Sequence, residues 1–592
     1  MLDVAASPEM GAVGVNGPKD EPLGWDQVDW ATVEGDVRRL RQRIFTATRE
    51  GDLRRVRRLQ KLMLRCRSNA LVAVRRVTEL NAGRKTAGVD GRLALLNSDK
   101  ADLAEWVQRG SGSWTPLPVR RVFIPKAGGK QRPLGIPVIA DRALQAVVLN
   151  ALEPEWEARF EARSYGFRPG RGCHDAIEAI YQTSKGRRPK RVWVLDADLA
   201  AAFDRIDHQH LLDRLGTFPA RGQVEAWLKA GVLDRGRFAP TEEGTPQGGV
   251  ISPLLLNVAL HGMEEAADVR YLSGSHVGHT APGSPVVVRY ADDLVALCHT
   301  REQAEQVKAR LAAWLTSRGL AFNEDKTRIV HLNEGFDFLS FHVRRYPNGK
   351  LIIKPSVAAV KRFRNRLRVE MRHLRGGNAA MVISRLNPIL RGWAAYYRTV
   401  VSKRVFVSID SYLWWLTWKW AVRNHRNKPK KWVVARYYGT FNKTRSDRWV
   451  LGDRDSGGYL TKTAWTKIVR HQMVDGFASP DDPGRTAYWV LRRRRRTPPV
   501  DKWGLLQLQR QQGRCPYCGR LLLQADHEPQ SPQDWERWIL VVRAAIRRQA
   551  VTADQDAAHL HGSHASRLVH TQCARKAARR TERPARDPIG LA

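Results

Sequence analysis

The sequence has few cysteines, few acidic residues relative to basic ones, and no long apolar run. Six cysteines in 592 residues exclude a disulfide framework. No apolar run approaches the ~18–20 residues of a membrane span, and the stretch before Trp25 lacks the basic and then apolar layout of a signal peptide. We therefore expect a cytoplasmic protein with no membrane partner.

Basic residues dominate the charge. The 100 lysines and arginines outnumber the 59 aspartates and glutamates, which gives a formal net charge of +41. A surplus of this size indicates a polyanionic partner, and without a predicted membrane span nucleic acid is favoured over an anionic membrane. Between Asp36 and Leu80 apolar residues recur at helical spacing with arginines between them. We expect two or three basic amphipathic helices that contact phosphates.

The most informative stretch is Val286–Leu297, in which two β-branched, apolar runs flank Tyr290-Ala-Asp-Asp293. This pattern predicts a strand, a tight turn and a strand, with two adjacent carboxylates at the turn. Because adjacent carboxylates repel each other, a divalent cation is their natural partner. Taken alone, the motif fits equally well a hairpin whose turn contains aspartates for conformational reasons.

A second acidic stretch, upstream, favours the metal. Residues 192–198 predict a buried strand that ends at Asp198, shortly before Phe203. If two strands converge, Asp198, Asp292 and Asp293 can hold two Mg²⁺ ions, one activating an attacking hydroxyl and the other neutralising a leaving pyrophosphate. Such a transfer depends on positioning and charge neutralisation more than on covalent help from the protein.

Three further motifs suit contact with phosphates or sugars. Residues 120–136 predict a hairpin with Gly-Gly at its bend, where Lys126 and Arg132 are placed to close on a triphosphate; a merely basic hairpin is the alternative. The loop at 164–172, rich in glycine and arginine, suits a sugar-phosphate strand. In the loop at 244–253, Gln247 precedes two glycines, which allow the backbone to approach a ligand closely.

In their order along the chain, these motifs and Asp325-Lys-Thr327 resemble the reverse transcriptase of group II intron-encoded proteins over residues 36–355. The resemblance implies the fingers and palm of a right-hand polymerase. By the same resemblance, Asp198, Asp292 and Asp293 are the Mg²⁺ ligands, Phe203 lies under the sugar and excludes ribonucleotides, Lys126 and Arg132 contact the triphosphate of the incoming dNTP, and Gln247 lies near its sugar.

The expected fold class is multidomain α/β. Aromatic residues recur at helical spacing between 386 and 431, which chiefly indicates core packing, and basic residues are interleaved with them. The stretch resembles the thumb or maturase domain, which in that family grips intron RNA. The arginine run at 492–496 favours contact with a DNA backbone over a solubility tail. The predicted domains are a disordered lead (1–35), a basic helical extension (36–90), fingers and palm (91–355), a helical thumb (356–440), a basic DNA-binding region (441–508) and a zinc-containing domain resembling HNH nucleases (509–592).

The last domain contains two pairs of zinc-type ligands. A Cys-x₂-Cys pair and a His-x₂-Cys pair suit a closed tetrahedral site for Zn²⁺. Between them, an Asp-His step resembles the first element of an HNH nuclease, which implies one metal-binding acid and one general base. The family pattern is broken at two later positions. The alternative is therefore a domain stabilised by zinc that has lost nuclease activity but still helps to bind DNA. The ligands are Cys515, Cys518, His570 and Cys573, the nuclease candidates Asp526 and His527, and the departures Ala565 and Ala574.

These observations predict an RNA-directed DNA polymerase that is also an intron maturase, with intron RNA, target DNA and dNTPs as partners. One rival is a non-catalytic splicing factor built on an inactive polymerase, although the intact set of acids argues against it. Another is a reverse transcriptase of a different bacterial lineage, such as a retron or a diversity-generating element, which the long thumb and the zinc tail disfavour.

Overall fold

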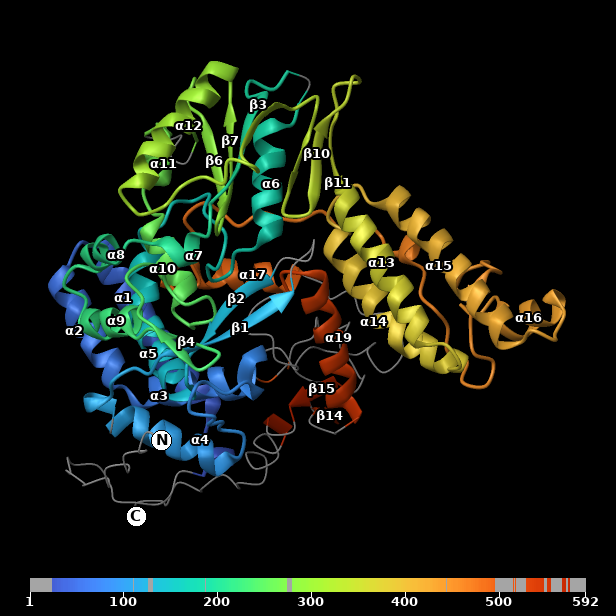
Figure 1. Ribbon diagram of the computed structural model, residues 1–592, viewed down its shortest axis with the longest axis horizontal. Coiled ribbons are helices and arrows are strands. Elements are labelled where there is room, and N and C mark those ends of the chain that lie inside the picture. Colours follow the sequence, from blue (N-terminus) through green and yellow to red (C-terminus); the bar gives the residue numbers. More distant parts are fainter. Residues whose placement is uncertain are drawn as a thin grey trace, which may run out of the picture.

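The computed structural model describes residues 24–109, 111–125, 131–186, 188–273, 279–442, 444–495, 515, 517, 529–547, 551–554, 567–570 and 573–574. Figure 1 shows three regions: a helical fingers region, a palm built on a sheet, and a helical thumb that projects to one side. This arrangement is that of a right-hand polymerase. No helix in the described part of the chain has the length and apolar character needed to cross a membrane.

The fingers begin earlier than the sequence predicts. Trp25 is buried and α1 already begins at Trp30, so the disordered lead expected up to residue 35 is wrong for residues 24–35. Asp52 caps the next helix by accepting a hydrogen bond from the backbone N–H of Arg55 (2.9 Å). The apolar faces of five helices form one core: α1 (Trp30–Arg49), α2 (Leu53–Arg65), α3 (Arg67–Arg75), α4 (Asn97–Arg109) and α5 (Ile139–Glu157).

A small sheet extends from the fingers. Its strand order is β2-β1-β4-β5, and β1 (Val119–Pro125) and β2 (Gln131–Ile136) form the predicted antiparallel hairpin. The parallel neighbour β4 (Val232–Asp234) and the edge strand β5 (Arg237–Ala239) complete it. Lys126, at the bend of the hairpin, lies outside the described residues.

The palm is a four-stranded antiparallel sheet, β6-β7-β3-β8, that is buried on both faces. Along β7, Leu294 and Ala296 belong to the core that contains α12 (Arg301–Thr316), whereas Val295 and Leu297 belong to the core that contains α6 (Cys173–Ser184). Burial on both faces explains why the strands are uninterrupted apolar runs. The strands are β3 (Trp193–Asp198), β6 (Val286–Tyr290), β7 (Asp293–Cys298) and β8 (Arg328–His331), and short helices lie between them: α7 (Ala202–Arg205), α8 (His208–Leu215), α9 (Arg221–Lys229), α10 (Ser252–Ala259) and α11 (Met263–Ala266).

The predicted closing sheet joins the palm to the thumb. It has the order β11-β10-β9, with β9 (Phe336–Phe338), β10 (Phe341–Arg345) and β11 (Leu351–Pro355). Ser356 caps the first thumb helix, and one apolar core runs from the palm into the thumb. The thumb helices are α13 (Val357–His373), α14 (Ala379–Tyr397), α15 (Lys403–Asn424) and α16 (Lys430–Tyr437).

After the thumb, β12 (Tyr438–Gly439) and β13 (Val450–Leu451) pair, and residues 466–495, here named the strap, return to the palm and the fingers. Within the strap, α17 (Thr486–Arg495) includes part of the arginine run. Arg492 is buried and pairs with Asp175 of α6 (2.9 Å), so the prediction that this arginine contacts DNA is wrong. Farther along, α19 (Pro532–Arg547) packs against α14, and β14 (Val551–Asp554) pairs with β15 (Arg567–His570).

Candidate functional site

The strand register of the palm brings the predicted acids together. Asp198, the last residue of β3, lies directly opposite Asp293, the first residue of β7. Asp292 precedes it in the turn from β6, and the backbone N–H of Leu199 donates to the Asp292 carbonyl oxygen (3.3 Å). The turn is tight because Ala291 adopts a left-handed conformation (φ +57°). Two paired strands and one turn thus converge three carboxylates at one end of the sheet.

The Ser164–Arg168 segment supports this turn from behind. A β-carbon added at Gly166 would lie 2.2 Å from the backbone nitrogen of Ala291, so only glycine allows the two backbones to pack this closely. The N–H of Tyr165 donates to the Arg289 carbonyl oxygen (2.9 Å), and Ser164 bridges in parallel to Arg289. The position of the acidic turn therefore depends on a loop more than a hundred residues away in the sequence.

Arg289 fastens the turn through its side chain. Its guanidinium is buried and donates to the Ala291 carbonyl oxygen (3.2 Å), to Asn257 Oδ1 (2.9 Å) and to Ser164 Oγ (2.7 Å). Asn257, on α10, in turn donates to the Gly166 carbonyl oxygen (2.9 Å). This network holds the turn and its supporting loop in one geometry.

The arginines of the 164–172 loop point inward. Arg168 forms a two-pronged ion pair with Glu157 (2.9 and 3.0 Å), and both side chains are almost fully buried. Arg171 is also buried and donates to the carbonyl oxygens of Gly476 and Ala478 in the strap. The prediction that these arginines grip a sugar-phosphate strand is therefore wrong, and the loop has an architectural role.

The carboxylates at the sheet end carry more negative charge than the nearby cations neutralise. Burial, followed by the negative charges of Asp292 and Asp198, raises the pKa of Asp293 to about 7. Burial also raises the pKa of Asp292. Lys326, from the predicted Asp-Lys-Thr motif, pairs with Asp198. Hard oxygen donors with unneutralised negative charge fit a divalent cation such as Mg²⁺.

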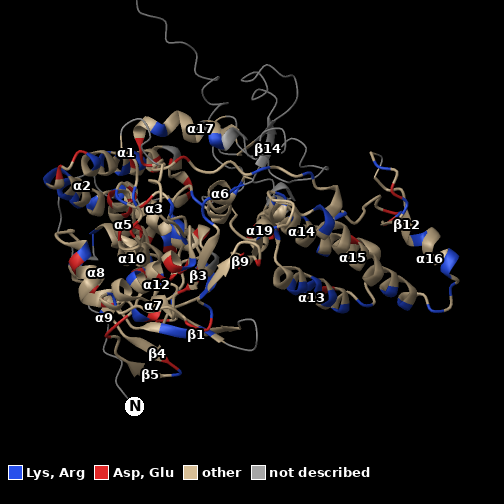
Figure 2. Cartoon of the chain, turned by 90° about the horizontal axis from the view of Figure 1, so that it is seen from above, with Lys and Arg blue, Asp and Glu red and all other residues tan. Residues whose placement is uncertain are grey.

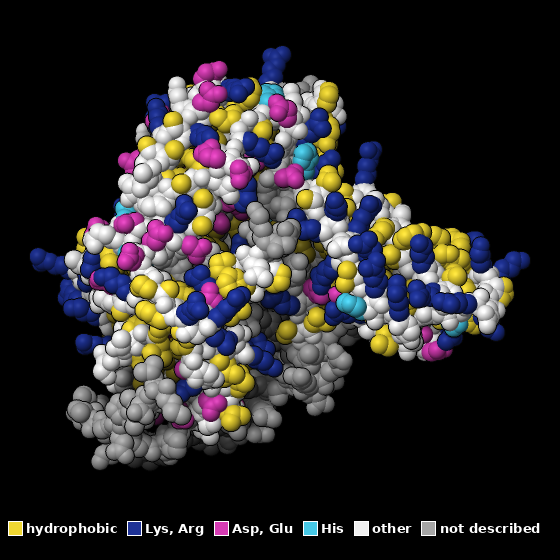
Figure 3. Space-filling view, viewed as in Figure 1, with side chains coloured by type: hydrophobic (Ala, Val, Ile, Leu, Met, Phe, Trp, Pro, Cys, Tyr) yellow, Lys and Arg dark blue, Asp and Glu magenta, His cyan; other side chains and the backbone are white. Residues whose placement is uncertain are grey.

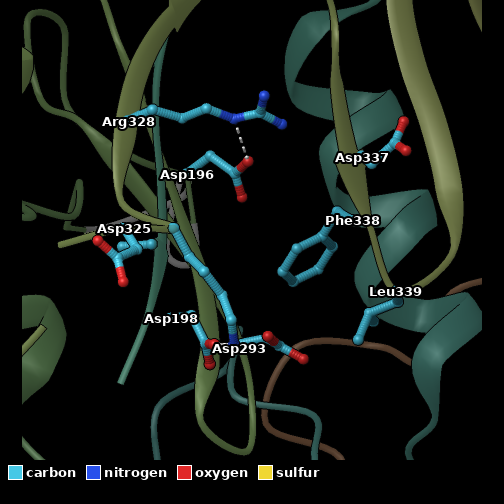
Figure 4. Close-up of a pocket in the computed structure, with 10 residues that line it drawn as sticks. Asp196, Asp198, Asp293, Asp325, Arg328, Asp337, Phe338 and Leu339 are labelled. Carbon is cyan, nitrogen blue, oxygen red and sulfur yellow. Dashed lines mark hydrogen bonds and ion pairs between the residues drawn. The ribbon is translucent and has the colours of Figure 1, made fainter. Parts of the chain in front are cut away.

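A cavity of about 380 Å³ opens beside two of these acids. Figure 4 shows Asp198 and Asp293 side by side at one end of the cavity. Phe338, the last residue of β9, and Leu339, which follows it, lie across from them. Arg328 closes another side by pairing with Asp196 (3.1 Å). The lining consists of Asp196, Ala197, Asp198, Asp293, Asp325, Lys326, Arg328, Asp337, Phe338 and Leu339.

The predicted nucleotide-binding residues lie on elements around the acids. Phe203, half-buried on α7, meets the exposed ring of Phe167 edge-on (6.1 Å between centroids, 71°). The Gln247 carbonyl oxygen accepts a hydrogen bond from the N–H of Gly135 (2.9 Å), which ties its loop to β2. The exposed Arg132 on β2 is close enough for its charge to lower the pKa of Asp292 against the effect of burial.

Comparison with known proteins agrees with this geometry. The description "Reverse transcriptase (RNA-dependent DNA polymerase)" matches residues 124–343, "N-terminal domain of reverse transcriptase" matches residues 25–107, and "Group II intron, maturase-specific domain" matches residues 360–438. Protein YkfC of Escherichia coli (strain K12) is 37% identical over 319 residues, which are 49% of this chain and 84% of YkfC. The chain belongs to the family of group II intron-encoded reverse transcriptases.

Other relatives of this reverse transcriptase have names that refer to introns and maturases. The group II intron-encoded protein LtrA of Lactococcus lactis subsp. cremoris is 29% identical over 297 residues, which are 40% of this chain and 49% of LtrA. Maturase-like protein 1 of Euglena gracilis is 26% identical over 372 residues, which are 61% of this chain and 74% of that protein. The chain therefore spans only about half the length of LtrA.

The C-terminal region of the reverse transcriptase contains a compact cluster of metal-type ligands. Ligand atoms of Cys515, His570 and Cys573 all lie within 4.8 Å of one another, and Cys573 Sγ is 3.8 Å from His570 Nδ1. The antiparallel pairing of β14 and β15 places His570 at a strand end, three residues before Cys573. Cys518, the predicted fourth ligand, lies outside the described residues, as do Asp526, His527 and Ala565.

Sequence reasoning missed the residues that position the acids. Arg289 directly precedes the Tyr-Ala-Asp-Asp motif, and a charge inside an otherwise apolar strand was a signal for a buried ion or hydrogen-bond network. Phe167 adopts φ +59°, which is unusual for a phenylalanine and turns its ring toward Phe203. Nothing in the sequence indicated that contact.

Proposed function

We propose that this reverse transcriptase binds a group II intron RNA, assists its splicing, and copies it into DNA at a DNA target. The observation that carries the polymerase part is the convergence of Asp198, Asp292 and Asp293 at one end of the palm sheet. The maturase-specific match over residues 360–438 supports the RNA part, as do relatives named as intron-encoded or maturase-like proteins.

The three carboxylates are the proposed ligands of two Mg²⁺ ions. When bound, the ions lower the pKa of the primer 3′-hydroxyl and neutralise the leaving pyrophosphate. The protein's part is positional: the strand register fixes Asp198 against Asp293, and Arg289 fixes the turn, so the acids need little reorganisation. Lys326 supplies a further cation at the same edge through its pair with Asp198.

The surrounding residues are proposed to select the nucleotide. Phe203, held against Phe167, would lie under the sugar and leave no room for a 2′-hydroxyl. Arg132, with Lys126 of the same hairpin, would contact the triphosphate, since an arginine fork binds phosphate oxygens in pairs. The hydrogen bond from the Gly135 N–H to the Gln247 carbonyl oxygen would hold the loop that contains Gln247 against this hairpin.

The C-terminal cluster is proposed to hold Zn²⁺ through Cys515, His570, Cys573 and the predicted fourth ligand Cys518. Three soft or borderline donors within 4.8 Å fit a closed tetrahedral site. The zinc would stabilise a C-terminal domain that binds target DNA. Alanine at position 574, where the nuclease pattern expects histidine or asparagine, favours DNA binding over strand nicking by Asp526 and His527.

Primer extension on an RNA template with Mg²⁺ and dNTPs tests the polymerase part. The parent protein is compared with Asp292→Ala and with Asp337→Asn, which removes an acid from the cavity beside Asp198 and Asp293 without changing the convergent set. We expect DNA product from the parent and from Asp337→Asn, and none from Asp292→Ala. No product from any variant, together with tight binding of folded intron RNA, would instead favour the non-catalytic splicing factor.

A further inference from the structure

The outer face of α15 exposes an aromatic ring, that of Trp415, beside the half-buried ring of Tyr412. Trp415 is 45% exposed, and Tyr412, one turn before it, stacks beside it (6.2 Å between centroids, 24°). By contrast, Trp414 and Trp418 on the same helix stack on each other and pack against the thumb core through Tyr438. Tyr412 is half-buried and packs against the thumb core, but the exposure of the Trp415 ring is not explained by packing of the thumb.

Cations border the rings of Tyr412 and Trp415. Lys419 Nζ lies 3.7 Å from the centroid of the Trp415 ring. The guanidinium of Arg364, on α13, lies 5.3 Å from the centroid of Tyr412 and is held there by Ser408 Oγ (2.6 Å). Cation–π contact orients both charges toward the aromatic surface. We name Arg364, Tyr412, Trp415 and Lys419 the α15 platform.

Acids do not neutralise the platform. Asp410, the one acid of α15, accepts hydrogen bonds from the backbone N–H groups of Thr463 and Ala464 on the other side of the helix. Glu370, the one acid of α13, is engaged by Arg385 through two hydrogen bonds (2.8 and 2.9 Å). Figure 2 shows lysine and arginine concentrated along α13, and Figure 3 shows a hydrophobic patch on the thumb bordered by basic side chains.

The platform lies apart from the polymerase site. Figure 1 shows α13 and α14 between α15 and the palm, and no platform residue lines the cavity beside the acids. The platform therefore lies outside the cavity beside the acids.

We propose that the α15 platform stacks an unpaired nucleobase of folded RNA, with Arg364 and Lys419 contacting the flanking phosphates. Aromatic rings beside cations are the usual means of holding unstacked bases in loops and bulges. A base-paired DNA target buries its bases, whereas folded RNA displays them, and all four residues lie within the maturase-specific match. The identification of that RNA as the intron rests on the proposed function; the stacking itself does not.

Fluorescence of 2-aminopurine in the loop of an RNA hairpin tests the stacking. The full-length protein is titrated against this hairpin, the same sequence as a fully paired RNA duplex, and the same hairpin in DNA. We expect quenching of the loop base by the parent. Trp415→Ala should weaken hairpin binding on the order of tenfold, as for loss of one stacked base, and should leave duplex RNA binding and primer extension unchanged.

Three comparisons make the result decisive. Val407→Ala, which truncates another exposed apolar side chain on α15, should match the parent, and Trp415→Phe should retain most of the quenching. Equal losses on hairpin and duplex RNA would overturn base stacking, and equal binding of the DNA hairpin would overturn the assignment to RNA. Because primer extension is measured separately, failure of the platform is distinguishable from failure of the polymerase.

Discussion

Buried aspartates have different surroundings in two regions of this molecule, the contact of the strap with α6 and the acidic end of the palm sheet. Where the strap packs on α6, Asp175 of that helix accepts hydrogen bonds from Arg492, His471 and the backbone N–H groups of Gly172 and Val474. At the sheet end, by contrast, three acids converge and burial raises the pKa of two of them.

Acids that are paired with arginine hold the fold together, whereas the converging acids of the palm are free to serve the reaction. Some buried acids are neutralised by arginine partners and serve to join the strap to the fingers. Arg41, for example, pairs with Asp481 (2.6 Å) and with Glu153 (2.7 Å). Acids paired in this way are not available to bind a cation. Converging acids without arginine partners repel one another and destabilise the fold. A bound cation would neutralise this repulsion. The two regions should therefore respond in opposite ways when an aspartate becomes asparagine.

The largest expected effect is that of Asp293→Asn. This isosteric change removes one charge from the convergent set and should reduce primer extension on the order of 10³-fold or more. Since the pKa of Asp293 is raised by burial and by its acidic neighbours, the same change should raise stability by on the order of 1 kcal/mol at pH 8 in a chelator. Denaturant unfolding of the two proteins checks the second part; a loss of stability would contradict it.

Asp175→Asn should have the opposite effects: lower stability and unchanged primer extension. It breaks a buried ion pair with Arg492 and weakens the bond to His471, so we expect a loss on the order of 3 kcal/mol in the free energy of unfolding. Extension per folded molecule should be retained. The control is Asp482→Asn in the same strap, whose partner Arg49 is largely exposed (3.2 Å); it should cost less than about 1 kcal/mol.

Convergence of the acids could be predicted because it follows from strand periodicity. Asp198 and Asp293 each end or begin an apolar run, and antiparallel pairing of such runs brings their polar ends together. The ligand cluster of Cys515, His570 and Cys573 was likewise visible in its spacing. Both predictions depend on residue type and local order, which the sequence states directly.

The role of each arginine could not be predicted in this way. Arg168, Arg171 and Arg492 look like a phosphate-binding series in sequence, yet all three are buried. Their partners come from loops and helices that only the tertiary fold brings near, as with Arg492 and Asp175, which are 317 residues apart. A positively charged composition therefore indicates that nucleic acid is bound, but not which arginines bind it.

Phe203→Ala tests whether the sheet end also selects the sugar. Removal of the ring that packs against Phe167 should open space beside the acids and relax discrimination between dNTP and rNTP on the order of tenfold to a hundredfold. Single-nucleotide incorporation with each nucleotide measures this. Phe238→Ala, which removes an exposed ring on β5, is the control, and unchanged discrimination in Phe203→Ala would rule out the steric role.

A third kind of buried acid, Glu264, belongs neither to the contact of the strap with α6 nor to the convergent set. Glu264 accepts a hydrogen bond from the Tyr271 hydroxyl (2.6 Å), while its Oε1 has no hydrogen-bond partner within the described residues. Burial raises its pKa from 4.5 to about 7. Because the folded state then holds the proton more tightly than the unfolded state, stability present at low pH is lost as the pH rises from about 4.5 to about 7.

Glu264→Gln should remove this loss, because a neutral amide carries no penalty for burial of charge. We expect the variant to be more stable than the parent by on the order of 2 kcal/mol at pH 8 and nearly equal to it at pH 4. Unfolding measured across this range, with the exposed neighbour changed by Glu265→Gln as control, checks the slope. If Glu264→Gln instead lowers stability at pH 8, the ionised carboxylate is compensated after all and resembles Asp175 more than Asp293.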